Sequence, residues 1–340
     1  MVFKGALRKG FLALILLGLV PGAQADDKPM EIVVSAPGPR NLTYLPVDLI
    51  NKIGADRAEG VVVKVRHTGG GGVALDDLMS RNSDFSVAGL PAAMSLRARD
   101  KNVVAIAAVS GAPLFILMVR SGLRGQVRTV ADLKGKVIGV NTSTLSSKTT
   151  SQQLAEIVLK RSGVTPDMVR IVAAGQSWEA QAVVLTSGIA DAVMGDEPFA
   201  SRLKAAKKVF FLVNLADPKD ARNIPGGGFL HAALETRAEL IKQEPAKAEV
   251  MVKILKRTLA WMAKASPEEI VAKLDVTDPD EKRWLVHTLK QYRKIFSTDG
   301  RFSIKQLKET EWFFQETSPQ QARASALKDM IIDRWAGIKD

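Results

Sequence analysis

From residue 31 onward, apolar side chains follow two spacings, one typical of strands and one typical of helices. Short runs rich in β-branched residues, as in buried strands, occupy 31–35, 61–66 and 84–87. Between these runs, apolar residues recur at helical spacing over 43–53 and 73–79. The pattern therefore predicts the order β-α-β-α-β.

The same order returns further along the chain. The spacing predicts strands at 136–140, 169–173 and 190–194 and helices at 147–161 and 178–186. This repeat predicts an α/β protein with two related lobes, each a mostly parallel sheet flanked by helices. Its strands are expected to end at a shared ligand cleft.

Two apolar runs, 103–120 and 209–215, link the two repeats and are expected to form a hinge. We expect one lobe to comprise 26–112 and 215–340 and the other to comprise 113–214. The C-terminal region is expected to be helical. Its predicted apolar faces are Val250, Ile254, Leu255, Leu259 and Met262 on one helix, and Leu327, Ile331, Ile332 and Trp335 on another.

Residues 1–25 have the pattern of a secretory signal peptide. Lys4, Arg8 and Lys9 precede the apolar run 11–20, and Ala23-Gln24-Ala25 fits a cleavage site. The apolar run is about half as long as the roughly 20 residues of a membrane-spanning helix. The chain has no cysteine for a lipid anchor. We therefore expect a soluble, monomeric protein in the periplasm.

Charge and composition narrow the function. The formal net charge is +12 for the whole chain. Anionic ligands, anionic lipid headgroups and plain solubility all fit this excess, whereas export argues against nucleic acid as a partner. The absence of cysteine excludes disulfides, thiol nucleophiles and Cys-ligated zinc. Histidines at 67, 231 and 287 form no HExxH motif, and no nucleophile elbow is present. We therefore predict no enzyme activity, cofactor or metal.

A polar loop follows the predicted strand 136–140. Residues 141–150 are mostly Asn, Ser and Thr, and we expect Ser146 or Ser147 to cap the next helix. Backbone N–H groups at such a helix start carry partial positive charge and favour anions. The loop therefore favours a sulfonate, a carboxylate or an oxyanion as the ligand.

Several segments together resemble a known family. They are ADLKGKVIGV, SGIADAVMGDEPF and EPAKAEVMVKILKRTLAWMAKASPEEIVAKL. They resemble the periplasmic solute-binding proteins of the nitrate/sulfonate/taurine/thiamine-precursor ABC importer family. The resemblance implies a type II-like periplasmic-binding-protein fold with two hinge crossovers. It also implies closure on a small solute and delivery to an ABC permease in the inner membrane.

Two other functions remain open. A ligand-loaded sensor that docks on a membrane receptor would need the same closing lobes. A cytoplasmic branch resembling this family makes the thiamine pyrimidine, but its cysteine-rich motif is absent here. The signal peptide also argues against that enzyme.

Candidate ligand-binding residues lie just after the predicted strand ends, where the family has its cleft. They include the segments 176–178 and 196–197. The selected residues are Arg40, Asn41, Tyr44, His67, Gly70, Gly71, Leu90, Ser110, Thr142, Ser143, Ser146, Ser147, Trp178 and Glu197.

Four of these candidates have an equally physical structural explanation. The run 69–72 also fits a tight turn, and His67 fits a structural hydrogen bond. Trp178 also fits a cover over an apolar sheet edge. Glu197, which precedes a proline at a helix start, also fits ordinary helix capping.

Overall fold

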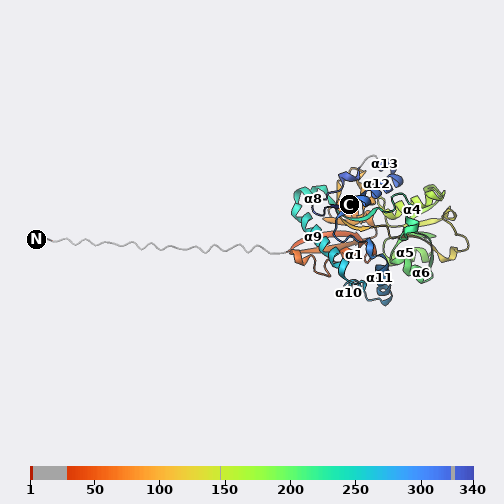
Figure 1. Cartoon of the computed structure of the whole chain (residues 1–340), viewed down its shortest axis with the longest axis horizontal. Helices are drawn as coiled ribbons and strands as arrows, with labels where there is room; N and C mark the ends of the chain where they lie inside the picture. Colours follow the sequence, from red (N-terminus) through yellow and green to blue (C-terminus); the bar gives the residue numbers. More distant parts are fainter. Residues whose placement is uncertain (3–28, 146, 323–325) are drawn as a thin grey trace.

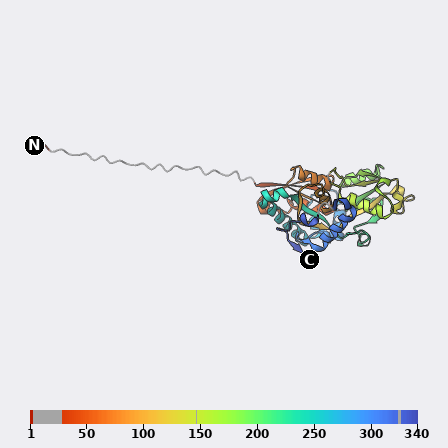
Figure 2. The ribbon, with the colours of Figure 1, turned by 90° about the horizontal axis from the view of Figure 1, so that it is seen from above.

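The computed structural model describes residues 1–2, 29–145, 147–322 and 326–340. Nearly all of the predicted signal peptide, and Ser146, lie outside the described residues. Figures 1 and 2 show two lobes side by side, one built mainly from the two ends of the sequence and the other from its middle. The described helices include none that is both long and apolar enough to cross a membrane.

Lobe 1 contains a five-stranded sheet in the order β2-β1-β3-β10-β4. Strands β1, β2 and β3 are parallel, and β10 runs antiparallel to both β3 and β4. The bounds are β1 Met30–Pro37, β2 Val61–Thr68, β3 Phe85–Gly89, β4 Val103–Gly111 and β10 Leu230–Arg237.

Lobe 2 repeats this plan in the order β7-β6-β8-β5-β9. Again three strands are parallel, and the fourth, β5, is antiparallel to both of its neighbours. The bounds are β5 Phe115–Arg120, β6 Val137–Val140, β7 Arg170–Ala173, β8 Ala192–Asp196 and β9 Val209–Asn214. The repeat predicted from the sequence is therefore confirmed. Each sheet is a mixed sheet, because one of its five strands, β10 or β5, runs antiparallel to its neighbours.

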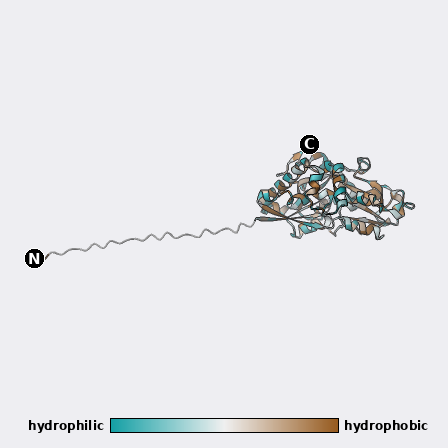
Figure 3. Cartoon of the chain, turned by 90° about the horizontal axis from the view of Figure 1, so that it is seen from below, coloured by the Kyte–Doolittle hydropathy of each residue, from teal (hydrophilic) through white to brown (hydrophobic). Residues whose placement is uncertain are grey.

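Helices cover both sheets. Their bounds are α1 Leu45–Leu49, α2 Gly71–Met79, α3 Leu90–Arg97, α4 Thr150–Arg161, α5 Trp178–Thr186, α6 Phe199–Ala205, α7 Pro218–Ala221, α8 Ala238–Gln243, α9 Pro245–Lys264, α10 Pro267–Ala272, α11 Pro279–Tyr292, α12 Ile304–Thr317 and α13 Pro319–Ala322. Figure 3 shows hydrophilic and hydrophobic residues mixed along these helices, as expected where one side faces a sheet and the other faces water.

The chain crosses between the lobes twice. It passes from β4 to β5 through residues 112–114 and returns from β9 to β10 through residues 215–229. Helix α12 reinforces this connection, because Phe313 packs in the lobe 2 core and Phe314 packs in the lobe 1 core. Phe313 also stacks on Phe229 with ring centroids 4.4 Å apart. The exact domain limits at 112/113 and 214/215 stay a prediction.

Three predicted helices differ from the structure. The first is shorter, because a 3-10 turn, Leu42–Tyr44, precedes α1 and the chain turns away after Leu49. Helix α4 is capped by Thr149, whose Oγ1 accepts from Gln152 N at 3.3 Å, and not by Ser147. The Ser147 hydroxyl donates instead to Ala92 O at 3.1 Å.

The apolar residues at 327–335 form a 3-10 turn, Leu327–Asp329, then a β-bridge at Ile331 and a turn at 334–336, so the predicted helical face there is wrong. Ala105 N donates to Met330 O at 2.8 Å, and Ile332 N donates to Ala105 O at 2.9 Å. Pairing with the edge of β4 satisfies this backbone in place of helical hydrogen bonds.

Candidate functional site

The two lobes touch across the cleft between their sheets. Leu42 N donates to Glu197 O at 3.2 Å, and Thr142 N donates to Gly69 O at 3.4 Å. Gln153, from α4 of lobe 2, donates through Nε2 to Pro91 O of lobe 1 at 3.2 Å. The structure therefore represents a closed arrangement of the lobes.

A buried carboxyl group lies at the centre of this contact. Asp196 ends strand β8 and is fully buried. Gln176 Nε2 and Gln181 Nε2 donate to its two oxygens, each at 3.0 Å. Burial raises the pKa of Asp196 to about 7, although hydrogen bonding to the amides of Gln181 and Gln176 acts in the opposite direction. Asp196 thus anchors two amides of lobe 2.

A histidine from lobe 1 lies among the rings of Tyr44 and Phe115. His231, on β10, is fully buried, and its ring centroid lies 6.1 Å from that of Tyr44 and 5.1 Å from that of Phe115. Burial lowers the pKa of His231 to about 3, so the ring is neutral at neutral pH. An alanine Cβ at Gly89 would lie 2.3 Å from Thr150 Oγ1 and 3.6 Å from His231 Nε2. Groups from both lobes therefore meet at Gly89.

We call Asn41, Tyr44, Asn141, Thr150, Gln176, Asp196 and His231 the cleft cluster. All are buried. Within the described residues, the cluster atoms without a hydrogen-bond partner are Asn41 Nδ2, Asn141 Oδ1, Gln176 Oε1, Thr150 Oγ1 and both ring nitrogens of His231. Leaving one such group unpaired costs about 1–3 kcal/mol. Several orphans meeting at one interlobe contact indicate a site that a ligand completes.

The cleft cluster contains no lysine or arginine. Of the buried polar residues that the structure describes, none is a lysine or an arginine. The described residues also contain no group of three His, Asp or Glu side chains placed to hold a metal ion. The chemistry available at the centre of the cleft is therefore neutral hydrogen bonding around one carboxyl group.

The structure brings some predicted residues to the lobe contact. Asn41 and Tyr44 belong to the cleft cluster. Thr142 and Gly70 meet where the loops of the two lobes touch, and Gly71 begins the adjacent helix α2. Three further candidates have partners nearby: Ser143 Oγ donates to Gln152 Oε1 at 2.7 Å, Ser147 Oγ donates to Ala92 O at 3.1 Å, and Ser110 Oγ donates to Thr43 O at 3.2 Å.

Other candidates are engaged in structural contacts. His67 Nε2 lies 2.7 Å from Asp48 Oδ1, and Arg40 forms an ion pair with Glu281. The ring of Trp178 is covered by the Arg202 guanidinium, whose carbon lies 4.0 Å from the ring centroid.

The remaining two candidates lie at helix starts. Leu90 is buried at the start of α3. The Glu197 carboxylate accepts from Ser201 N at 3.1 Å and from Ser201 Oγ at 2.6 Å. Ligand contact by any residue of the candidate set stays a prediction.

Sequence reasoning did not select Thr150, Gln181 or His231, and it placed Asp196 only within a candidate segment. A usable signal existed for His231, because a polar side chain inside the apolar run of β10 must be buried with or without a partner. Gln181 gave a weaker signal, because a glutamine on a helix is ordinary. Its role depends on Asp196 lying beside it.

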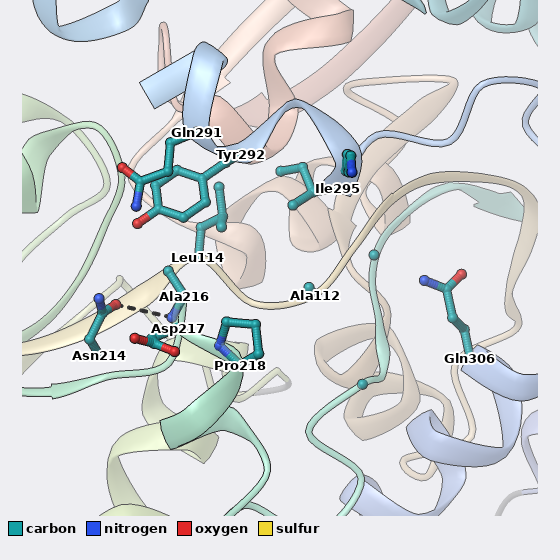
Figure 4. Close-up of a pocket in the computed structure, with 13 residues that line it drawn as sticks. Ala112, Leu114, Asn214, Ala216, Asp217, Pro218, Gln291, Tyr292, Ile295 and Gln306 are labelled. Atoms are coloured by element: carbon teal, nitrogen blue, oxygen red, sulfur yellow. Dashed lines mark hydrogen bonds between the residues drawn. The ribbon is translucent and has the colours of Figure 1, made fainter. Parts of the chain in front are cut away.

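Open pockets elsewhere on the molecule do not coincide with the cleft cluster. One, of about 510 Å³, lies where the chain crosses between the lobes and is lined by residues such as Ala112, Asn214 and Tyr292 (Figure 4). There, Asn214 Oδ1 accepts from Ala216 N at 3.1 Å. None of the lining side chains carries a buried polar atom without a partner. The orphaned groups therefore favour the cleft cluster as the site.

Replacing Asp196 with asparagine is expected to change the pH dependence of stability of the ligand-free protein. Burial raises the pKa of Asp196 from 3.8 to about 7, so the folded protein holds a proton that the unfolded chain releases between these values. The contribution of Asp196 to the free energy of unfolding therefore falls as pH rises through this window.

Between pH 5 and pH 8, the variant should gain about 2 kcal/mol relative to the wild type, as measured by chemical denaturation. His231 and Glu235 titrate in both proteins, so the difference isolates Asp196. If the free energies of unfolding of variant and wild type differ by the same amount at pH 5 and at pH 8, the pKa of Asp196 is not raised.

The two lobes, their shared strand plan and the cleft between them define the periplasmic-binding-protein fold. The chain belongs to the family described as NMT1/THI5 like, which matches residues 57–270. The resemblance to periplasmic solute-binding proteins of ABC importers is thereby confirmed. No curated protein matches the chain.

Solved structures with this fold include a protein from Bordetella bronchiseptica RB50, with a TM-score of 0.81 at 20% identity over 91% of this chain and 96% of that chain. The alkanesulfonate-binding protein of Xanthomonas axonopodis pv. citri, bound to MOPS, has a TM-score of 0.71 at 15% identity over 90% and 99% of the two chains. The periplasmic aliphatic sulphonate binding protein of Escherichia coli has a TM-score of 0.63 at 13% identity over 90% and 93%.

The same fold also occurs in an enzyme. A desulfurization enzyme has a TM-score of 0.53 at 16% identity over 90% of this chain and 97% of that chain. The fold alone therefore does not distinguish binding from catalysis, and the distinction depends on the chemistry of the site.

Proposed function

We propose that the protein binds a small organic solute in the cleft cluster as its lobes close, and that it delivers this solute in the periplasm to an ABC permease of the inner membrane. The observation that carries the proposal is the set of unpartnered buried groups where the two lobes meet. Membership of the family supports the transport role. We propose that the protein acts as a monomer, without a cofactor or a nucleic-acid partner.

We also propose binding without catalysis. Neither ring nitrogen of His231 has a hydrogen-bond partner among the described residues, so this histidine activates no nucleophile there. Asp196 is held by two glutamine amides, which suits a carboxyl that positions other groups. Closure of two lobes around such groups excludes water and strengthens each hydrogen bond to the solute.

The proposal is tested by native mass spectrometry of protein purified from the periplasm. We expect a small molecule to be retained by the purified protein and released on mild unfolding. Adding this molecule back to the refolded protein should raise the melting temperature of the protein. The molecule itself should stay chemically unchanged. Conversion of the molecule into a product would replace binding with catalysis. Cells lacking the protein should also fail to take up the molecule; unaffected uptake would favour the sensor role.

A further inference from the structure

Asp196 fixes the orientation of the side-chain amides of Gln176 and Gln181. Gln176 Nε2 and Gln181 Nε2 donate to the two oxygens of Asp196, so both amides turn their NH2 groups toward it. Gln181 Oε1 then packs against Gly195, where an added Cβ would lie 2.4 Å away. Gln176 Oε1 has no partner, and neither has Asn141 Oδ1. Asn41 Nδ2 also lacks a partner, so the free amide atoms of the cleft cluster are two acceptor oxygens and one donor nitrogen.

An anion would find little compensation at this place. The buried polar residues that the structure describes include no lysine or arginine, and the carboxyl of Asp196 is already present. Basic residues of the neighbouring loops and helices have acidic partners: Arg40 pairs with Glu281, Lys148 with Glu156, and Arg202 with Asp278. A negative charge in this poorly solvated site would lack a compensating cation and would oppose ionisation of Asp196.

The helix N-termini that would attract an anion, those of α2 and α4, are covered by groups of the protein. Thr149 Oγ1 accepts from Gln152 N at the start of α4. At the start of α2, an added Cβ on Gly72 would lie 3.1 Å from Ser147 O and 3.2 Å from Thr144 N, so the loop of lobe 2 covers this end. The partial positive charge of these helices is therefore screened from the cleft by the protein itself.

We propose that the solute of this site is a nitrogen compound that donates N–H hydrogen bonds to the cleft cluster and is neutral or cationic where it enters. This inference rests on the proposed function and specifies its substrate class. Amides, amidines and amines have the required chemistry. Gln176 Oε1 and Asn141 Oδ1 accept from the solute, and Asn41 Nδ2 donates to it. Asp196 holds Gln176 in place, and Thr150 and His231 complete the contact as donor or acceptor.

Two series of matched probes test this class on the wild-type protein after its retained ligand is removed. The acetyl series is acetamidine, acetamide, acetate and methanesulfonate, and the benzoyl series is benzamidine, benzamide, benzoate and benzenesulfonate. Within each series the probe molecules are similar in size and differ in charge. We expect an amidine or amide to raise the melting temperature by a few degrees at millimolar concentration, and the anions to leave it unchanged.

Variants then identify the residue responsible. Asp196→Asn should weaken binding of the stabilising probe about tenfold or more, because asparagine has one acceptor oxygen and cannot hold both glutamine amides. Asp167→Asn removes an exposed carboxyl of the same lobe and should bind as the wild type does. Circular dichroism checks that both variants fold, and the probe series on the wild type does not depend on them.

The outcomes separate the two proposals. Stabilisation by acetate, benzoate or a sulfonate alone would overturn the nitrogen class and keep the binding function. An anionic molecule retained from the periplasm would do the same. No retained molecule and no shift with any probe would overturn the binding function, and with it the inference that rests on it.

Discussion

Replacing Gly70 with alanine is expected to weaken solute binding about 100-fold, because the added methyl group blocks closure of the lobes. A Cβ at this position would lie 2.6 Å from Thr142 O and 2.8 Å from Thr142 N, which are backbone atoms of the opposite lobe. These atoms cannot move aside as the end of a side chain can. Overpacking of this kind costs about 1–3 kcal/mol, and here the cost falls on the closed state alone.

The fold of lobe 1 should tolerate the same change. Gly70 has φ 170°, an extended conformation that any residue adopts. The free energy of unfolding in denaturant should therefore stay within about 0.5 kcal/mol of the wild type, while calorimetry with the retained solute shows the lost affinity.

Gly69→Ala is the matched control, because its Cβ would meet side-chain atoms of Thr142 at 3.4 Å or more and no backbone atom within 4 Å. This variant should bind almost as the wild type does. Equal affinity of Gly70→Ala and Gly69→Ala would show that the two loops stay further apart in the ligand-bound protein.

The four-glycine run shows what the sequence could not resolve. The run 69–72 follows a strand, and both a tight turn and ligand contact fitted this position. The structure gives it a further role, since Gly70 and Gly72 let the backbone of lobe 2 approach. That role depends on how two separately folded lobes meet, and no local spacing of apolar residues encodes this contact.

The sheets were predictable for the opposite reason. Buried parallel strands read as short apolar runs, and each run here is followed by a helix with one apolar face. Both repeats were therefore visible before the structure. The apolar residues 327–335 were misread, because pairing with the edge strand β4 buries the same kind of side chains as a helix does.

The site was predictable only in part, because burial of polar side chains is a tertiary property. Asn41 and Tyr44 follow a strand end and were accessible to reasoning from sequence. His231 lies on β10, the strand by which the chain returns to lobe 1 after building lobe 2. The proximity of His231 to Tyr44 could therefore be known only from the strand order. Lysines and arginines are abundant in the sequence, and only the structure shows that the described ones stay out of the cleft centre.

A second glycine run has a structural role, and its test has the larger effect on stability. Replacing Gly226 with alanine is expected to lower the free energy of unfolding by about 3 kcal/mol. Gly226 has φ +66°, which disfavours alanine, and its Cβ would lie 2.3 Å from Glu309 O and 2.5 Å from Phe313 N on α12. This close approach holds α12 against the second crossover, where Phe313 stacks on Phe229.

Gly228→Ala provides the comparison within the same run, because its φ lies outside the left-handed region and its Cβ would meet Glu309 Cγ at an ordinary 3.6 Å. Denaturant unfolding of both variants should show a large loss for Gly226→Ala and a change within about 0.5 kcal/mol for Gly228→Ala. Similar stabilities would mean that α12 does not pack on the crossover in solution. Since α12 contributes Phe313 to one lobe and Phe314 to the other, losing this contact should loosen the hinge as well as the fold.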